Sequence, residues 1–123
     1  MKRILVDMTL TLLHHGHVRL LKNAAELGHV TVALTIDEEI ERVKGFWPPM
    51  NFEQRKEIAL SIRYVDDVVP CKWLIDEEFL DEHGMDLLVH GDDCENLVPE
   101  HRKVIFPRTD AISSSMLRND LFN

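Results

Sequence analysis

Cysteine is scarce in this sequence, which has two cysteines, Cys71 and Cys94, among 123 residues. They lie far apart and form no Cys-x-x-Cys pair, so we expect neither a cysteine zinc site nor a disulfide framework. No apolar run approaches the ~20 residues that a membrane-spanning helix needs. The opening Met1-Lys2-Arg3 leads directly into a strand-like segment rather than a signal peptide. These absences predict a protein of the reducing cytoplasm with no membrane partner.

Positive charge is also in short supply. The chain has 14 lysines and arginines against 22 acids, a formal net charge of −8. This balance argues against a nucleic-acid or anionic-membrane surface, because such binding requires many phosphates to be neutralised. A nucleotide needs only a few local cations and is not excluded. The composition, 45% apolar and 29% charged, is that of a globular protein. Without repeats or a linker, residues 1–123 are expected to form one domain.

Strand-like and helix-like segments alternate along the chain. Apolar or β-branched runs predict strands, and amphipathic segments with capping residues predict helices. The expected strands are 2–8, 29–36, 67–70, 85–90 and 104–106, and the expected helices are 17–27, 37–43, 52–64, 73–83 and 113–121. Gly28 suits a C-cap for the first helix. This alternation predicts an α/β fold, a single Rossmann-like doubly wound domain with a five-stranded parallel sheet and helices on both faces.

Several polar segments follow the expected strands. In a doubly wound sheet the ligand lies beyond the carboxyl ends of the strands. Segments 9–17, 35–44 and 91–93 each follow an expected strand, and Arg108 follows the last one. We therefore expect these segments to converge on one site, whatever family the chain belongs to.

Three histidines surround Gly16 at the entrance to the first helix: His14, His15 and His17. A helix N-terminus offers unpaired N–H groups and partial positive charge to a phosphate. His14 and His17 would add two donors, whereas His15 is expected to face away. A zinc site is a second interpretation, since three imidazoles are a common zinc set, but their spacing does not place them on one helical face. A structural cluster that binds nothing is a third.

Two motifs together indicate a family. Residues 14–17 read His-His-Gly-His and match an H-x-G-H signature. About ninety residues later, residues 108–115 read Arg-Thr-Asp-Ala-Ile-Ser-Ser-Ser and answer Arg-Thr-x-Gly-Ile-Ser-(Ser/Thr)-(Ser/Thr). Two signatures in the right order are more specific than either alone. The chain thus resembles the small H-x-G-H nucleotidyltransferases, in particular the cytidylyltransferases that make CDP-glycerol and their phosphonate-activating relatives.

The resemblance implies an activity and a set of site residues. It implies transfer of CMP from CTP, with Mg²⁺, to a small phosphorylated alcohol similar to glycerol 3-phosphate or to a phosphonate, with release of pyrophosphate by a homodimer. By resemblance, the catalytic residues are His14, His17, Lys44 and Arg108; the nucleotide-binding residues are Thr9, Leu10, Gly16, Asp93, Thr109, Ser113 and Ser114; and the acceptor-binding residues are Arg63 and Trp73. No side chain is assigned to the metal.

Simpler interpretations exist for several of these residues. Lys44 fits a solvated loop residue, and Asp93 fits a tight turn with exposed acids. Segment 108–114 fits a capped helix that binds nothing. Arg55 and Arg63 fit salt bridges on a helix surface.

The chain also departs from the family pattern. Thr11 stands where relatives usually have Asp, and Ala111 stands where they have Gly. The acids at 76–78 replace lysines of the glycerol-phosphate branch, which favours an acceptor that carries a cationic amine. Two other functions stay open: an adenylyltransferase of the same fold, and a nucleotide-binding module without independent activity.

Overall fold

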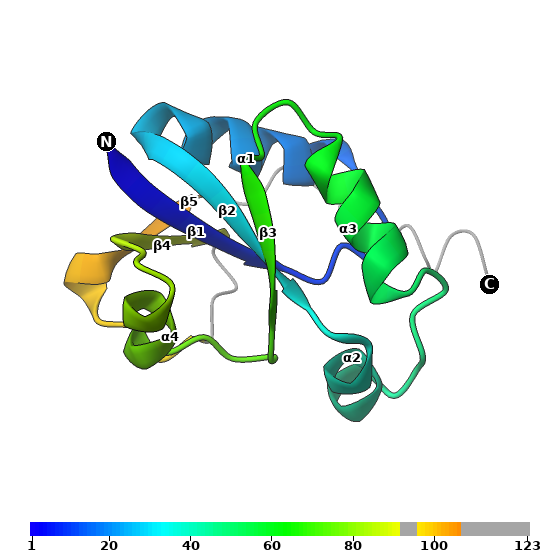
Figure 1. Cartoon of the computed structure of the whole chain (residues 1–123). Helices are drawn as coiled ribbons and strands as arrows, with labels where there is room; N and C mark the ends of the chain where they lie inside the picture. Colours follow the sequence, from blue (N-terminus) through cyan, green and yellow to red (C-terminus); the bar gives the residue numbers. More distant parts are fainter. Residues whose placement is uncertain (92–95, 107–123) are drawn as a thin grey trace.

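The computed structural model describes residues 1–91 and 96–106 of the chain. Its strands form one parallel five-stranded sheet in the order β3-β2-β1-β4-β5 (Figure 1). The strands are β1 Lys2–Met8, β2 Gly28–Thr35, β3 Asp67–Cys71, β4 Leu87–Gly91 and β5 Lys103–Phe106. The predicted α/β fold with a parallel sheet is therefore confirmed. The helix expected at 113–121 lies outside the described residues.

Helices cover both faces of the sheet. They are α1 His15–Leu27, α2 Asp37–Lys44, α3 Phe52–Leu60 and α4 Glu77–Glu82, with a 3₁₀ turn at Glu100–Arg102. On one face, Leu21 of α1 and Ala59 of α3 belong to the apolar cluster that contains Val6. On the other, Leu80 of α4 packs in the cluster that contains Leu5. None of the helices within the described ranges is long and apolar enough to cross a membrane.

Two helices are shorter than the sequence predicted. α3 ends at Leu60 rather than near residue 64, because the chain must turn so that Asp66 can reach β2. There the Val30 N–H donates to Asp66 Oδ2 at 2.9 Å, and the Asp66 N–H donates to the Val30 carbonyl at 2.9 Å. α4 begins at Glu77 rather than at residue 73, because Asp76 is its N-cap and accepts from the Phe79 N–H at 2.9 Å. Polar partners outside the helix therefore set both boundaries.

Gly28 is needed for a close approach rather than for a left-handed cap. It follows α1 directly, but its backbone is extended and it is already the first residue of β2. A Cβ atom at this position would lie 2.1 Å from the Lys2 carbonyl oxygen of β1. Only a residue without a side chain lets α1 end so close to the sheet.

Pro70 lies inside β3 instead of ending it, since the strand continues to Cys71. β3 is an edge strand that pairs with β2 alone. A proline lacks the N–H that a central strand would have to donate, so the edge is where a sheet tolerates one. The sequence prediction was one residue short for this reason.

Candidate active site

The segment after β1 turns sharply before it reaches α1. Leu10 has a φ of 53°, the left-handed region that residues with a Cβ rarely adopt. Its side chain is fully buried, and the next residue, Thr11, is buried as well. Packing of this leucine therefore stabilises a backbone bend that carries the chain from the sheet edge to the histidines.

His14 and His17 form a reciprocal cap at the start of α1. His14 Nδ1 accepts from the Gly16 N–H at 3.0 Å, and His17 Nδ1 accepts from the His14 N–H at 3.2 Å. The two ring centroids lie 4.0 Å apart. Because both Nδ1 atoms accept, each neutral ring carries its proton on Nε2. His15 is exposed, as expected. The helix entrance therefore carries two Nε2–H donor groups.

Both capping imidazoles are uncharged at neutral pH. Burial, with a smaller contribution from His14, lowers the pKa of His17 to about 4. Burial, with a smaller contribution from His15, also lowers the pKa of His14. At neutral pH these rings are therefore neutral hydrogen-bond donors and not cations.

The low pKa of His17 makes the stability of the fold sensitive to acid. The unfolded chain takes up a proton near pH 6.5, whereas the folded chain does so only near pH 4. This contribution is complete above pH 6.5 and is lost as the pH falls toward 4. Between pH 7.5 and 5 we expect His17 to cost about 2 kcal/mol of unfolding free energy.

Urea unfolding at both pH values measures this loss. His17→Asn is the matched control, because its side-chain oxygen can replace Nδ1 as the cap but does not titrate. The wild type should lose about 2 kcal/mol more than this variant. Equal losses would contradict the burial of a neutral imidazole at this position.

Lys44 and Trp73 lie together although they are distant in sequence. Lys44, the last residue of α2, places Nζ 5.5 Å from the centroid of the Trp73 ring. The Trp73 N–H donates to Glu39 Oε1 at 3.0 Å. Hydrogen bonds from Arg42 and from this N–H lower the pKa of Glu39 to about 2. Glu39 thus joins α2 to the segment that follows β3. The sequence predicts a helix at 37–43, but it does not predict this contact.

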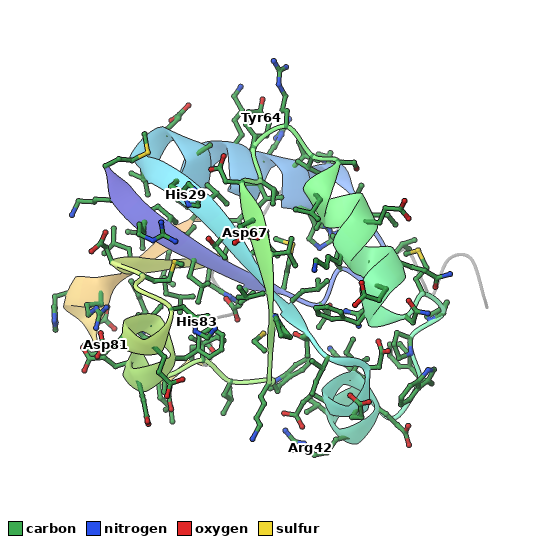
Figure 2. The ribbon with its side chains drawn as sticks, viewed as in Figure 1. His29, Arg42, Tyr64, Asp67, Asp81 and His83 are labelled. Atoms are coloured by element: carbon green, nitrogen blue, oxygen red, sulfur yellow. The ribbon has the colours of Figure 1, made fainter. Side chains whose placement is uncertain are left out.

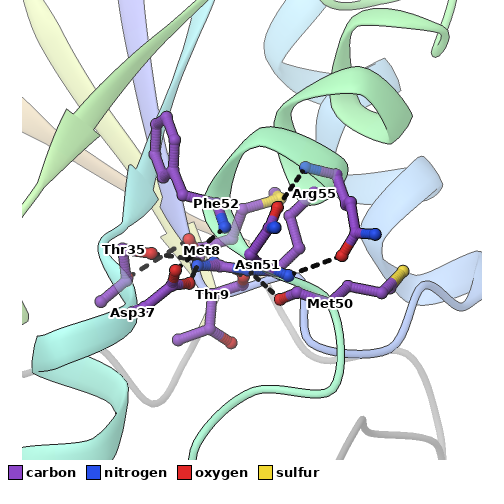
Figure 3. Close-up of polar contacts among 9 residues, drawn as sticks. Met8, Thr9, Thr35, Asp37, Met50, Asn51, Phe52 and Arg55 are labelled. Carbon is purple, nitrogen blue, oxygen red and sulfur yellow. Dashed lines mark hydrogen bonds and ion pairs between the residues drawn. The ribbon is translucent and has the colours of Figure 1, made fainter.

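Arg55 is buried beneath this edge of the sheet rather than exposed on a helix. Its Nη1 donates to the carbonyl oxygens of Thr9 at 2.7 Å and Thr35 at 2.8 Å, and Nε donates to Met50 at 3.1 Å (Figure 3). Its Nη2 pairs with Asp37 Oδ1 at 2.5 Å. The interpretation of Arg55 as a surface salt bridge is therefore wrong. One guanidinium fastens the ends of β1 and β2 to the loop before α3.

Arg63 lies near the amino end of β3, whereas the histidines follow the carboxyl end of β1. It follows α3 and precedes β3, with its guanidinium carbon 5.8 Å from the centroid of the Tyr64 ring. Figure 2 shows Tyr64 and Arg42, a residue of α2, at opposite ends of the molecule. Within one copy of the chain the structure therefore does not bring Arg63 to Lys44 and Trp73.

Five of the residues assigned by resemblance belong to segments 92–95 and 107–123. Asp93, Arg108, Thr109, Ser113 and Ser114 lie outside the described residues. Within residues 1–91 and 96–106, no three His, Cys, Asp or Glu side chains are grouped so as to hold a metal ion. The three histidines at the helix entrance therefore do not form such a group.

A model of the family described as "Cytidylyltransferase-like" matches residues 11–120 of this chain. The chain belongs to the cytidylyltransferase-like family. It is similar to the glycerol-3-phosphate cytidylyltransferase of Staphylococcus aureus (strain NCTC 8325 / PS 47), with 37% identity over 99% of this chain and 96% of that protein. It is 35% identical to the protein of the same name from Bacillus subtilis (strain 168), over 98% of both chains.

A solved structure supports the fold independently. The crystal structure of the lipopolysaccharide core biosynthesis protein from Thermoplasma volcanium GSS1 superposes with a TM-score of 0.73, at 19% identity, over 89% of this chain and 98% of that one. Such low identity bears on the fold alone. The family match confirms the resemblance inferred from the two motifs, and it makes this cytidylyltransferase-like chain a nucleotidyltransferase enzyme.

Sequence reasoning missed one polar cluster of this cytidylyltransferase-like site. Asp7 at the end of β1 contacts His90 at the end of β4, and Asn96 donates to the same carboxylate. The signal was present, because each of the first two is a polar residue inside an apolar strand. Such residues are buried only with partners.

Proposed function

We propose that the protein transfers CMP from CTP to a small phosphorylated alcohol or phosphonate and releases pyrophosphate. The observation that carries this proposal is the pair of neutral imidazoles at the N-terminus of α1, whose Nε2–H groups are free of the capping bonds. Its relatives in Staphylococcus aureus and Bacillus subtilis, which match nearly from end to end, are named glycerol-3-phosphate cytidylyltransferases. Donors of this kind suit the phosphates of a nucleotide.

Catalysis in this proposal consists of positioning and charge stabilisation. An oxygen of the acceptor phosphate attacks the α-phosphorus of CTP in line with the departing pyrophosphate. His14 and His17 donate to the phosphates as negative charge grows on them, and Lys44 supplies a cation from the end of α2. We assign a second cation to Arg108, and nucleotide contacts to Thr9 and Leu10. Mg²⁺ would enter with CTP and would offset the negative charge of its phosphates.

We assign the acceptor site to the region near Trp73, after the end of β3. A cavity of about 360 Å³ lies here and is lined by Ile36, Pro70, Cys71, Lys72, Leu74, Asp76 and Phe79. Two of the three acids at 76–78 already have structural partners, since Asp76 caps α4 and Glu77 pairs with Arg102 at 3.1 Å. These contacts favour a phosphorylated alcohol such as glycerol 3-phosphate over an acceptor selected by a cationic amine.

A direct assay tests the function. Pyrophosphate release is measured from CTP and from ATP with glycerol 3-phosphate, phosphoethanolamine and 2-aminoethylphosphonate. We expect release from CTP with the glycerol acceptor. Preference for ATP would favour an adenylyltransferase, and no release with any acceptor would favour a nucleotide-binding module.

CTP should also stabilise the folded protein before any transfer occurs. At a concentration 100 times its dissociation constant, a ligand that binds only the folded state adds ~2.7 kcal/mol to the unfolding free energy. Urea unfolding with and without CTP measures this gain, and ATP at the same concentration is the control. An equal gain with both nucleotides would contradict selection of the cytosine base.

We further propose a cytoplasmic homodimer. Arg63 is exposed at the sheet edge opposite the site, so any contact with an acceptor would have to be made across a dimer interface. Cys71 is a free, buried thiol, in keeping with a reducing compartment. Sedimentation equilibrium of the wild type tests the oligomeric state.

A further inference from the structure

Helix α2 is fastened to the segment after β3 at three successive points. The Ile36 N–H, at the N-cap of the helix, donates to the Cys71 carbonyl at 3.0 Å. Further along, the Glu39 side chain accepts from the Trp73 N–H at 3.0 Å. At the last residue of the helix, Lys44 Nζ lies 5.5 Å from the centroid of the Trp73 ring. Trp73 is therefore held twice from α2, through its backbone by Glu39 and through its ring by Lys44.

Arg42 fixes the orientation of the Glu39 carboxylate. Arg42 Nε donates to Glu39 Oε2 at 2.8 Å, and Nη2 donates to Oε1 at 3.0 Å. A guanidinium that binds both oxygens of a carboxylate in this way sets the plane of the carboxylate. Only 16% of the Glu39 side chain is exposed, against 63% of the Arg42 side chain. The carboxylate therefore lies between an arginine on the solvent side and the backbone of Trp73, with Oε1 directed at the Trp73 N–H.

The segment that Glu39 holds has no regular structure of its own. Residues 72–75, between β3 and α4, belong to neither a helix nor a strand. Their N–H groups therefore bond to side chains from other parts of the chain, Trp73 to Glu39 and Ile75 to Asn96. A segment without ladder hydrogen bonds keeps its position only through such partners. The place of the Trp73 backbone thus depends on Glu39.

The charges around Trp73 suit an anionic ligand. Lys44 lies over its ring and Lys72 precedes it in the chain. Within the described part of the chain, neither lysine forms a salt bridge. The one carboxylate that bonds to the Trp73 backbone, Glu39, is already paired with Arg42. Two ammonium groups that are not neutralised by carboxylates are therefore near the indole ring, where a phosphate or phosphonate group would be attracted.

We propose that Glu39 is a positioning residue for the acceptor, an inference that rests on the proposed function. By holding the Trp73 backbone, Glu39 sets the place of the indole ring. A cation is attracted to the face of an aromatic ring, so the ring in turn sets the place of the Lys44 ammonium. Glu39 itself does not contact the acceptor. It acts through Trp73 and Lys44, which would bind the anionic group of the acceptor.

Substitutions at Glu39 separate the hydrogen bond from the charge. Glu39→Gln removes the charge but keeps a side-chain oxygen that can accept from the Trp73 N–H. Glu39→Asp keeps the charge but withdraws the carboxylate by one methylene, and Glu39→Leu removes the acceptor atom altogether. We expect Glu39→Asp and Glu39→Leu to lower kcat/KM for glycerol 3-phosphate about tenfold, because a displaced binding group costs rate, and Glu39→Gln to stay within about twofold of wild type.

Glu41→Leu is the matched control. Glu41 is exposed on the same helix, and within the described residues its side chain has no salt bridge or hydrogen bond. This variant should keep the kcat/KM of wild type. In Glu39→Leu, KM for glycerol 3-phosphate should rise while KM for CTP stays unchanged. Equal kcat/KM in all variants, an equal rise of both KM values, or normal activity in Glu39→Asp with a defect in Glu39→Gln would overturn the proposal.

Hydrogen exchange of the Trp73 amide, followed by NMR on the whole chain, tests the link without turnover. A bonded N–H exchanges more slowly than one open to solvent. We expect protection in the wild type and Glu39→Gln, and at least about tenfold faster exchange in Glu39→Asp and Glu39→Leu, since the bond to a charged group is lost. Equal exchange in all four proteins would overturn the inference. Failure of the wild type to release pyrophosphate with any acceptor would instead contradict the proposed function, so the two failures are distinguishable.

Discussion

Replacing His17 with alanine should leave a folded protein whose kcat/KM falls by ~10²–10³, the usual cost of removing one donor to a transition-state oxygen. The ring has two different roles: Nδ1 accepts from the His14 N–H, and in the proposed mechanism Nε2–H donates to a phosphate. Alanine removes both. Steady-state pyrophosphate release with glycerol 3-phosphate measures the loss, and circular dichroism checks the fold.

Two amide variants separate these contributions. In His17→Asn the side-chain oxygen can occupy the place of Nδ1, so the cap is kept and the donor is lost. In His17→Gln the longer side chain can carry an N–H to the place of Nε2 and gives up the cap. We expect His17→Asn to be stable and nearly as inactive as His17→Ala, and His17→Gln to be more active. Near-normal turnover by His17→Ala would contradict the proposed role of the helix entrance.

Replacing Arg55 with methionine should have the largest effect on stability. The guanidinium is fully buried and is bonded to three carbonyl oxygens and to Asp37. Without it, Asp37 keeps the hydrogen bond from the Phe52 N–H but loses its cationic partner in a largely buried position. Removing one member of a buried pair typically costs about 3–5 kcal/mol, a large part of the 5–15 kcal/mol that stabilises most domains. Urea unfolding of the two proteins gives the difference.

The double variant Arg55→Met with Asp37→Asn tests the cause. It removes the uncompensated carboxylate, so it should recover part of the lost free energy, although the unpaired carbonyl oxygens remain. Arg55→Lys keeps the charge but supplies one donor group in place of a planar fork, and should fall between wild type and Arg55→Met. If Arg55→Met unfolded at the same urea concentration as wild type, the guanidinium would not brace this edge.

Local sequence determined how much could be predicted. Strands buried on both faces give unbroken apolar runs, so the alternation that specifies a parallel α/β sheet was readable, and so was the helix entrance with its two imidazoles. Arg55 was not, because an arginine in a helix is usually exposed. Its role depends on the carbonyl oxygens of Thr9 and Thr35, which lie in distant segments and meet Arg55 only in the fold. Asp7 and His90 are likewise 83 positions apart in the chain.

The predicted end of α3 and the predicted start of α4 were wrong for a related reason. The amphipathic pattern predicts that α3 extends to about residue 64. The chain leaves the helix earlier because Asp66 bonds to Val30, which lies on β2. Asp76 caps the start of α4 through a local hydrogen bond. The N–H groups of Trp73 and Ile75 bond to the side chains of Glu39 and Asn96 instead of joining the helix. Competition from tertiary hydrogen bonds is not visible in a single segment.

The absence of a side chain at Gly28 affects the position of the histidines at the opposite end of α1. α1 has 13 residues and is therefore about 20 Å long, with Gly28 just past one end and His14 just before the other. A methyl group at residue 28 would push that end of the helix off the Lys2 carbonyl. Because α1 tilts as a rigid body, the imidazoles at its other end would shift as well. A mutagenesis library designed to alter the choice of acceptor should therefore keep Gly28.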